Sequence, residues 1–244
     1  MAVGGLSAAT ARADQPASAR AGVSAVAPLN AKLRVADRRP LQLHGVLLDA
    51  SASTGSITAY IFHFGDGVVE QSYQPLSLHG YRTPGTFHAT VVVIDAGGHQ
   101  STSASVRIHV RDGIPPVVRI DVPRPNQRMR LGSSGLRLSG KVSDNVGVAR
   151  VQLAIQLVSS RQHFQTHGAC IWYDAHRFLL LSACAAPYFF NAQTRHGRWT
   201  FRIDPAATIP RGTYVVRVRG IDRAGNISHF FAVSLRTILP FQLA

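Results

Sequence analysis

Glutamate and lysine are nearly absent from this sequence of 244 residues. Glu70 is the only glutamate, and Lys32 and Lys141 are the only lysines, so the remaining acidic residues are aspartate and the remaining basic residues are arginine. Glutamate and lysine commonly fill the solvent-facing positions of helices, and their scarcity argues against a helical protein. Alternating runs of valine, threonine, serine, tyrosine and phenylalanine are present instead, and such runs are typical of strands. We therefore expect an all-β protein.

Long hydrophobic runs are missing as well. The best candidate for a membrane span, residues 178–190, is interrupted by Ser182 and Pro187. It is also too short to cross the hydrocarbon core of a bilayer. We expect no membrane span.

The N-terminal residues 1–25 are small, weakly apolar and partly polar. Within them, Ala11-Arg12-Ala13 has the A-x-A form of a signal-peptidase site. Two interpretations remain open: the end of a secretory signal peptide whose start lies upstream, and a leader rich in alanine and serine. In either case the last part of this stretch is expected to be a flexible tether.

Only two cysteines are present, Cys170 and Cys184. An even count within one region favours a single disulfide formed in an oxidising compartment. Two free thiols are the alternative. A zinc site with His167 and His176 is the least favoured interpretation, because the spacing matches no standard zinc motif.

From residue 29 onward the chain consists of short alternating segments that end at glycine, proline, aspartate or asparagine. Several short strands, separated by a turn about every 8–12 residues, are typical of antiparallel sandwiches. We expect strands at 41–48, 57–64, 86–94, 101–110, 117–122, 136–142, 148–157, 198–203, 213–221 and 228–238. Ile114-Pro115-Pro116 predicts a short, stiff junction, because proline cannot donate to a sheet and favours extended neighbours. We therefore expect a leader at 1–25, sandwiches at 26–112 and 113–238, and a tail at 239–244.

Five separated pieces of the first half form one pattern, namely Leu48-Asp49-Ala50-Ser51, Tyr60-Ile61-Phe62-His63-Phe64-Gly65-Asp66-Gly67, His79-Gly80-Tyr81, Gly85-Thr86-Phe87 and Val93-Ile94-Asp95-Ala96-Gly97-Gly98. Through these pieces the first half resembles a polycystic-kidney-disease (PKD) domain. Phe62 and His63 stand where the family usually has tryptophan and aspartate. Phenylalanine keeps an aromatic core residue, whereas histidine cannot supply a carboxylate.

The second half contains the segments Val142-Ser143-Asp144-Asn145-Val146-Gly147-Val148, Gly212-Thr213-Tyr214 and Ile221-Asp222-Arg223-Ala224-Gly225-Asn226. Through these segments it resembles the immunoglobulin-like repeats of secreted bacterial surface proteins. Together the two resemblances imply two tandem immunoglobulin-like β-sandwiches in an extracellular or cell-surface protein. Such architectures are associated with spacers, adhesion modules and polysaccharide-binding accessories, and fold alone does not identify a ligand.

Catalytic motifs are not found. A glycosidase needs two carboxylates flanking one bond in a cleft, but the aspartates here sit at strand ends beside small or polar residues, where aspartate commonly hydrogen-bonds the backbone of a turn. The G-x-S-x-G elbow, the phosphate-binding loop and the H-E-x-x-H motif are absent from the sequence. We expect no enzymatic activity.

Calcium is a second metal for which the sequence offers weak candidates. The loops after the second and sixth strands of such a sandwich lie at the same end, which brings Asp144 and Asn145 toward Asp222 and Asn226. Calcium binds about six to eight oxygens, and this group offers two carboxylates beside Arg223. Hydrogen-bonded turns are therefore favoured over a calcium site, and no other cofactor is expected.

Arginine gives the chain a formal net charge of +14 and a pI near 11.2. Such a charge raises nucleic acid as a partner, but the arginines are dispersed and no recognition helix or arm is found, so specific nucleic-acid binding is disfavoured. Period-two spacing directs Arg217 and Arg219 outward on one strand and Arg150 outward on a neighbouring strand. We expect these three like charges to repel one another on one outer face. A polyanion site and a solvated face both remain open there.

The expected function is a non-catalytic extracellular binding or adhesion module that recognises a glycan or a protein at a cell surface. A structural spacer without a ligand is the alternative from a different class, and a polyanion- or DNA-binding protein is the third.

Overall fold

The computed structural model describes residue 1 and residues 27–130, 133, 135–160, 170–176, 178–181, 186–204 and 212–238. These residues form strands and turns and contain no helix, which confirms the all-β prediction. Accordingly, the described part of the chain has no helix of the length and apolarity that crossing a membrane requires. Most of the expected leader and the tail at 239–244 lie outside the described residues, so the signal-peptide interpretation stays a prediction.

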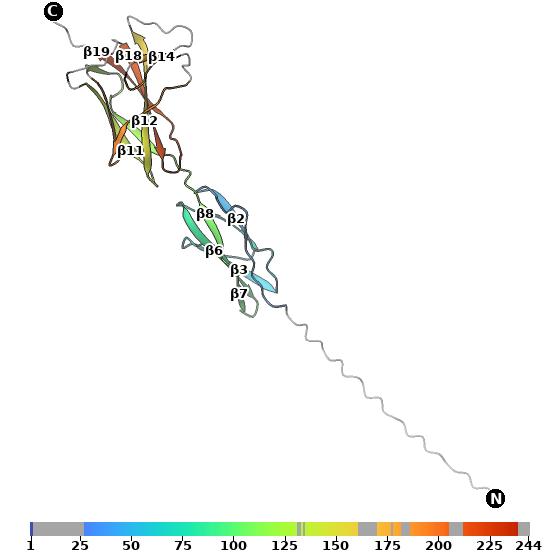
Figure 1. Cartoon of the computed structure of the whole chain (residues 1–244). Helices are drawn as coiled ribbons and strands as arrows, with labels where there is room; N and C mark the ends of the chain where they lie inside the picture. The colour runs from blue at the N-terminus through green and yellow to red at the C-terminus, as the bar shows by residue number, and fades with distance from the viewer. Residues whose placement is uncertain are drawn as a thin grey trace, which may run out of the picture.

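The first sandwich is built from two antiparallel sheets (Figure 1). One sheet has the order β1-β2-β5, with β1 at Arg34–Val35, β2 at Gly45–Asp49 and β5 at Leu76–Gly80. The other has the order β4-β3-β6-β7, with β4 at Val69–Ser72, β3 at Ile57–His63, β6 at Gly85–Asp95 and β7 at Gln100–Thr102. β8 at Val106–Val110 also pairs with β6.

Alternation of apolar and polar residues explains why these segments are strands with one buried face. In β8 the valines and isoleucine are buried, whereas Arg107 and His109 between them are exposed. Tyr60, Phe62 and Phe64 stack in sequence along β3 and its end, and Phe62 and Phe64 are fully buried. The aromatic stripe that the sequence shows is therefore part of the core.

The second sandwich is also made of two sheets. One has the order β16-β17-β11-β9, with β16 at Gln193–Arg195, β17 at Arg198–Ile203, β11 at Leu136–Ser143 and β9 at Val117–Val122. The other has the order β10-β19-β18-β12-β13-β14, with β10 at Gln127–Arg130, β19 at Phe231–Ile238, β18 at Gly212–Asp222, β12 at Val148–Ser160, β13 at Cys170–Tyr173 and β14 at Phe178–Leu181. β15 at Phe190–Asn191 pairs with β12, and β10 runs parallel to β19.

Each sandwich has its own hydrophobic core. The first core gathers buried residues between Ala31 and Val110, and the second gathers buried residues between Val118 and Val218. The sandwiches lie end to end and are joined by a short segment around residues 111–116 (Figure 1). This arrangement confirms the prediction of two tandem immunoglobulin-like sandwiches. Independent folding of the halves stays a prediction.

Most expected strands differ in their bounds by one to three residues or more; β12, for example, extends to Ser160. The segment at 41–48 becomes a strand only at Gly45, because Leu43 adopts a left-handed backbone with a φ of 65°. The segment at 101–110 is divided into β7 and β8, and the segment at 228–238 begins as a strand at Phe231. The short strands β1, β4, β5, β10 and β13 to β16 were not predicted.

Candidate functional site

The three arginines of the predicted polyanion face lie on the two central strands of the large sheet. Val151, Leu153 and Ile155 of β12 are buried inward, as expected. Arg219 of β18 pairs with Gln152 of β12, and Arg217 is two residues away on the same face.

The face is partly covered by aromatic rings rather than bare. The Arg217 guanidinium lies 5.3 Å from the centroid of the Trp172 ring, and the Arg219 guanidinium lies 3.8 Å from the centroid of the Phe189 ring. Trp172 is itself buried, together with Ala154 on the same outer side of β12. The sheet therefore carries a small second apolar cluster on the face that the sequence suggested would be open.

Two glutamines accept hydrogen bonds from these guanidinium groups. Arg217 Nη1 donates to Gln156 Oε1 at 2.7 Å, and Arg219 Nε donates to Gln152 Oε1 at 2.9 Å. Burial lowers the pKa of Arg217; burial and then the nearby Arg150 charge lower the pKa of Arg219. Repulsion among the three arginines stays a prediction, and Arg217 and Arg219 already have partners within the fold.

A denser arginine cluster lies on the first sandwich, where the sequence analysis did not expect it. Arg107, His109 and Arg111 point outward at every second position along and just after β8, and Arg38 and Arg39 lie beside them. Arg38, Arg39, Thr86, Arg107 and His109 line a surface depression of about 520 Å³. We call Arg38, Arg39, Arg107, His109 and Arg111 the arginine cluster.

Backbone hydrogen bonds hold the two parts of the arginine cluster together. The N–H of His109 donates to the carbonyl of Arg38 at 2.8 Å, and the N–H of Arg111 donates to the carbonyl of Pro40 at 2.8 Å. Arg111 Nε also donates to the carbonyl of Arg39 at 3.0 Å. These hydrogen bonds fix the backbone of residues 38–40 beside β8, and one of them also positions the Arg111 side chain.

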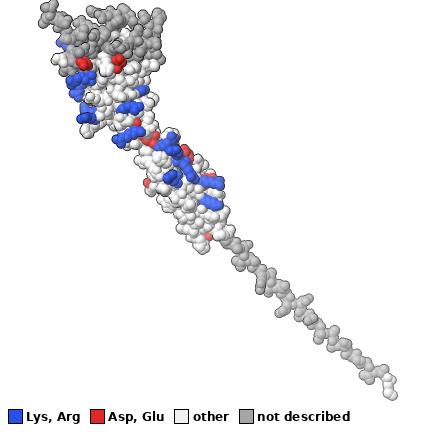
Figure 2. All heavy atoms as spheres, in the orientation of Figure 1, with Lys and Arg blue, Asp and Glu red and all other residues white. Residues whose placement is uncertain are grey.

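Within the described residues no ion pair joins a carboxylate to the arginine cluster, although the Asp37 carboxylate accepts a hydrogen bond from the Arg39 N–H at 2.7 Å. Among the described residues, the ion pairs that occur join His79 to Asp66, His99 to Asp95 and Arg198 to Asp121, and none involves the cluster. Figure 2 shows basic side chains in blue along the visible face of both sandwiches, with few acidic side chains in red among them. The signal that could have identified the cluster is the alternation Arg107-x-His109-x-Arg111 between buried apolar residues.

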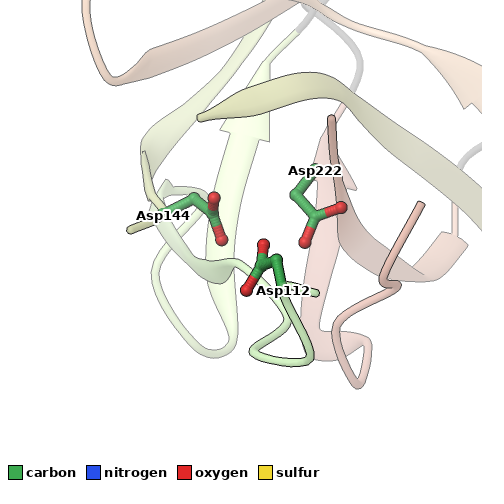
Figure 3. A group of neighbouring side chains, drawn as sticks. All are labelled: Asp112, Asp144 and Asp222. Atoms are coloured by element: carbon green, nitrogen blue, oxygen red, sulfur yellow. The ribbon is translucent and has the colours of Figure 1, made fainter. Parts of the chain in front are cut away.

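Another group of polar residues lies at the end of the second sandwich that faces the first. One carboxylate oxygen from each of Asp112, Asp144 and Asp222 lies within 4.8 Å of the other two. We call these three residues the junction carboxylates (Figure 3). The structure brings Asp144 and Asp222 together as the sequence suggested, and it adds Asp112 from the linker between the sandwiches.

Asn145 and Asn226, which the sequence analysis expects beside these aspartates, act as hydrogen-bond donors. Asn145 Nδ2 donates to Asp112 Oδ1 at 3.2 Å and to Gln42 Oε1 of the first sandwich at 3.3 Å. Asn226 Nδ2 donates to Asp222 Oδ2 at 2.8 Å and to the carbonyl of Asp112 at 3.3 Å. Both asparagines therefore fix the linker against the second sandwich.

The predicted disulfide falls partly on residues that the structure does not describe. Cys170 is buried in β13, and Gln156 Nε2 lies 2.9 Å from its sulfur. Cys184 lies outside the described residues, so its pairing with Cys170 stays a prediction.

Comparison with known proteins supports the first half of the interpretation. Residues 27–108 match the PKD domain family, which confirms the resemblance there. The bacterial immunoglobulin-like assignment of the second half stays an expectation. Among curated proteins, no sequence matches the chain.

Several solved structures are similar in arrangement over most of the chain. They include the fibronectin(III)-like modules of Clostridium thermocellum CbhA (14% identity, 87% of this chain and 95% of that chain, TM-score 0.34) and the D00-D0 domain of Intimin (13% identity, 86% and 100%, TM-score 0.32). The sialic acid binding region of a Streptococcus sanguinis SK1 adhesin is similar at 10% identity, with 88% of this chain and 78% of that chain covered and a TM-score of 0.24. Scores this low carry no functional argument.

Proposed function

We propose that this chain is an extracellular, non-catalytic module that binds an anionic polysaccharide at a cell surface through the arginine cluster. The observation that carries the proposal is the depression on the first sandwich, which is lined by Arg38, Arg39, Arg107 and His109 and by no carboxylate. Within the described residues, none of these four side chains takes part in an ion pair.

Guanidinium groups suit such a ligand for geometric and electrostatic reasons. Arginine presents a planar fork of donors that matches carboxylate, sulfate and phosphate groups in pairs of parallel hydrogen bonds. Since the side chains of the cluster are exposed, binding should depend on salt, because exposed charges are screened by ions. A formal net charge of +14 adds long-range attraction for any polyanion.

Retention on heparin and on an anionic wall polymer tests the proposal. We expect Arg38→Ser/Arg107→Ser to weaken binding about tenfold at low salt, because two charge-assisted contacts are lost. Arg119→Ser/Arg128→Ser is the matched control, since it removes two exposed arginines from the second sandwich. Equal loss in both variants would show that only overall charge matters and would contradict a site at the cluster.

Competition with duplex DNA separates this function from the polyanion alternative. A polysaccharide module should remain bound to the wall polymer in an excess of DNA of equal charge. Displacement by DNA at the same charge concentration would favour a general polyanion binder.

A structural spacer is the second candidate function, and a specific observation favours it. Asn145 links Gln42 of the first sandwich to Asp112 of the linker, and Asn226 holds the same linker from the second sandwich. These contacts connect the two sandwiches through the linker, which supports a spacer. A spacer would be retained on none of the glycans or matrix proteins tested.

A further inference from the structure

The junction carboxylates form a compact group of acidic side chains in a strongly basic protein. Asp112 comes from the linker, Asp144 from the turn after β11, and Asp222 from the end of β18. Figure 3 shows that each of the three side chains directs an oxygen toward the space that they share. The group thus joins the linker to two loops of the second sandwich.

Two oxygens in this group are buried without a hydrogen-bond partner. Asp112 is only 8% exposed, and its Oδ2 has no partner, whereas its Oδ1 accepts hydrogen bonds from the Ile114 N–H and from Asn145. The two carboxylate oxygens of Asp144 differ in the same way. Its Oδ1 accepts hydrogen bonds from the backbone N–H groups of Val146 and Gly147, whereas its Oδ2 is buried without a hydrogen-bond partner. A buried, unpaired carboxylate oxygen is costly and calls for a cation or a donor.

Asp222 completes the group from the opposite side. It is 2% exposed, and its oxygens accept hydrogen bonds from the N–H and the Nδ2 of Asn226, which fix its orientation. Arg223 is the nearest candidate counterion by sequence, but no ion pair joins it to a junction carboxylate within the described residues. Within the described residues, therefore, no ion pair neutralises the three carboxylates.

We infer that the junction carboxylates bind a calcium ion that fixes the linker to the second sandwich. Calcium accepts about six to eight oxygen ligands at about 2.3–2.6 Å, so two oxygens on one ion can lie up to about 5 Å apart. The separation of the junction oxygens, within 4.8 Å, satisfies that limit. Magnesium keeps several of its waters and is held by few protein carboxylates, so a site with three carboxylates suits calcium better.

The linker position of Asp112 gives the ion a mechanical consequence. Because Asp112 is a ligand from outside the second sandwich and Asn145 also contacts Gln42, occupation of the site restrains the first sandwich relative to the second. Calcium would thereby stiffen the tandem. This inference is independent of whether the arginine cluster binds a polysaccharide.

Calcium titration of the intact chain, after treatment with EDTA and desalting, tests the inference. Calorimetry should show one site, and saturating calcium should raise the Tm of the second sandwich by roughly 10 °C at a concentration of about 100 times the Kd. Magnesium at the same concentrations should bind at least about tenfold more weakly. Absence of heat and of a Tm shift up to millimolar calcium, or equal binding of magnesium, would overturn the assignment.

Substitutions place the ion within the structure. Asp144→Asn should weaken calcium binding at least about tenfold, because one charged ligand is lost while the amide oxygen can still accept the hydrogen bonds from Val146 and Gly147. Asp222→Asn should also weaken calcium binding, and because both Asp222 oxygens accept hydrogen bonds from Asn226, the Tm of this variant without calcium is measured alongside. Asp49→Asn is the matched control, since Asp49 Oδ1 accepts a hydrogen bond from the Ser51 N–H in an exposed turn remote in sequence from the group. Calcium binding that Asp144→Asn and Asp222→Asn leave unchanged would overturn the site.

Hydrogen exchange measures the effect on the junction. Calcium should slow exchange of the amides of Ile114, Val146 and Gly147, which donate to Asp112 and Asp144. This slowing of exchange should be lost in Asp144→Asn at the same calcium concentration. Calcium binding without slower exchange in the linker would overturn the role of the ion at the junction.

Discussion

Asp66 and His79 form the most buried ion pair of the described residues in the first sandwich, with Asp66 Oδ2 2.8 Å from His79 Nε2. The His79 ring stacks on Phe64, with centroids 3.9 Å apart, and Tyr81 donates to the carbonyl of Phe64 at 3.0 Å. Burial, with a smaller contribution from Asp66, raises the pKa of Tyr81 to about 12. Residues just after β3 of one sheet and residues in and just after β5 of the other sheet thus form one polar and aromatic group.

The Asp66 carboxyl should make stability depend on pH in the acid range. Burial raises its pKa, but the hydrogen bonds from His79 and from the Val68 N–H outweigh burial, so the pKa lies below 3.8. A carboxyl with a lower pKa in the folded state stabilises the fold above its unfolded pKa, and this contribution is lost as pH falls through the folded pKa. Asp66→Asn should therefore lower the Tm of the first sandwich at neutral pH, and its difference from wild type should shrink below pH 3.8. Calorimetry at both pH values measures this, and a constant difference would contradict it.

Gly140 illustrates a packing requirement at the same scale. A Cβ at this position would lie 1.9 Å from the carbonyl oxygen of Arg119 and 2.6 Å from Trp199 Nε1. Neither group can move alone, because the indole N–H donates to that same carbonyl at 3.0 Å and Trp199 is fully buried.

We expect Gly140→Ala to lower the free energy of unfolding of the second sandwich by about 1–3 kcal/mol, the usual cost of overpacking. Gly80→Ala is the control, since the nearest atom to its Cβ would be 3.8 Å away. That substitution should change stability by less than about 0.5 kcal/mol. Scanning calorimetry on the intact chain compares both, and equal effects would show that the close approach at Gly140 can relax.

At the scale of elements, β12 shows where the pattern in the sequence is informative and where it is not. The alternation of apolar residues correctly predicts which side chains face the core. It does not predict that Ala154 and Gln156 on the other face are also buried, because Trp172 from β13 belongs to a segment without alternation. The burial of a face therefore depends on a neighbouring strand that the pattern did not identify.

Arg217 should stabilise the sheet although it lies near other positive charges. Arg217→Ser removes the contact with Trp172 and leaves Gln156 Oε1 without its donor, so we expect a loss of about 1–2 kcal/mol in the free energy of unfolding. Arg150 is exposed, and Arg150→Ser should change stability by less than about 0.5 kcal/mol. Urea unfolding measures both. A neutral or stabilising Arg217→Ser would mean that repulsion between the arginines dominates.

The pairing of Cys170 with Cys184 can be tested by chemistry. A disulfide that closes a loop of this size should stabilise by roughly 3 kcal/mol in the chain-entropy model. Intact mass after alkylation without reductant should show no labelled cysteine, and after reduction it should show both labelled. Two labelled thiols in unreduced protein from an oxidising compartment would contradict the pairing.

Sequence patterns predicted the long strands better than the junction. The expected strand at 101–110 is broken because the buried Ser103 exchanges hydrogen bonds with the backbone of Val91. This contact between distant residues has no local signature. Asp112 was likewise interpreted as a turn residue, because its approach to Asp144 and Asp222 depends on how the linker folds back against two loops.

At the scale of the whole molecule, charge is distributed unevenly over an end-to-end pair of sandwiches. Basic side chains occupy outer faces, whereas three carboxylates lie where the linker meets the second sandwich. The proposed polysaccharide site on the first sandwich and the proposed cation site at the junction therefore consist of different residues. Asn145 of the second sandwich donates hydrogen bonds both to Gln42 of the first sandwich and to Asp112 of the linker.

Fragments divided at Gly113 test whether the sandwiches fold independently. Each has its own core, so residues 1–113 and 114–244 should each unfold cooperatively. Both tryptophans, Trp172 and Trp199, belong to the second sandwich, so tryptophan fluorescence in the intact chain should follow only the second transition, while calorimetry detects both. Because the division also removes Asp112 from the second fragment, that fragment should bind calcium more weakly than the intact chain. Failure of both fragments to fold would show that the halves are one cooperative unit, since neither core would then be sufficient without the other.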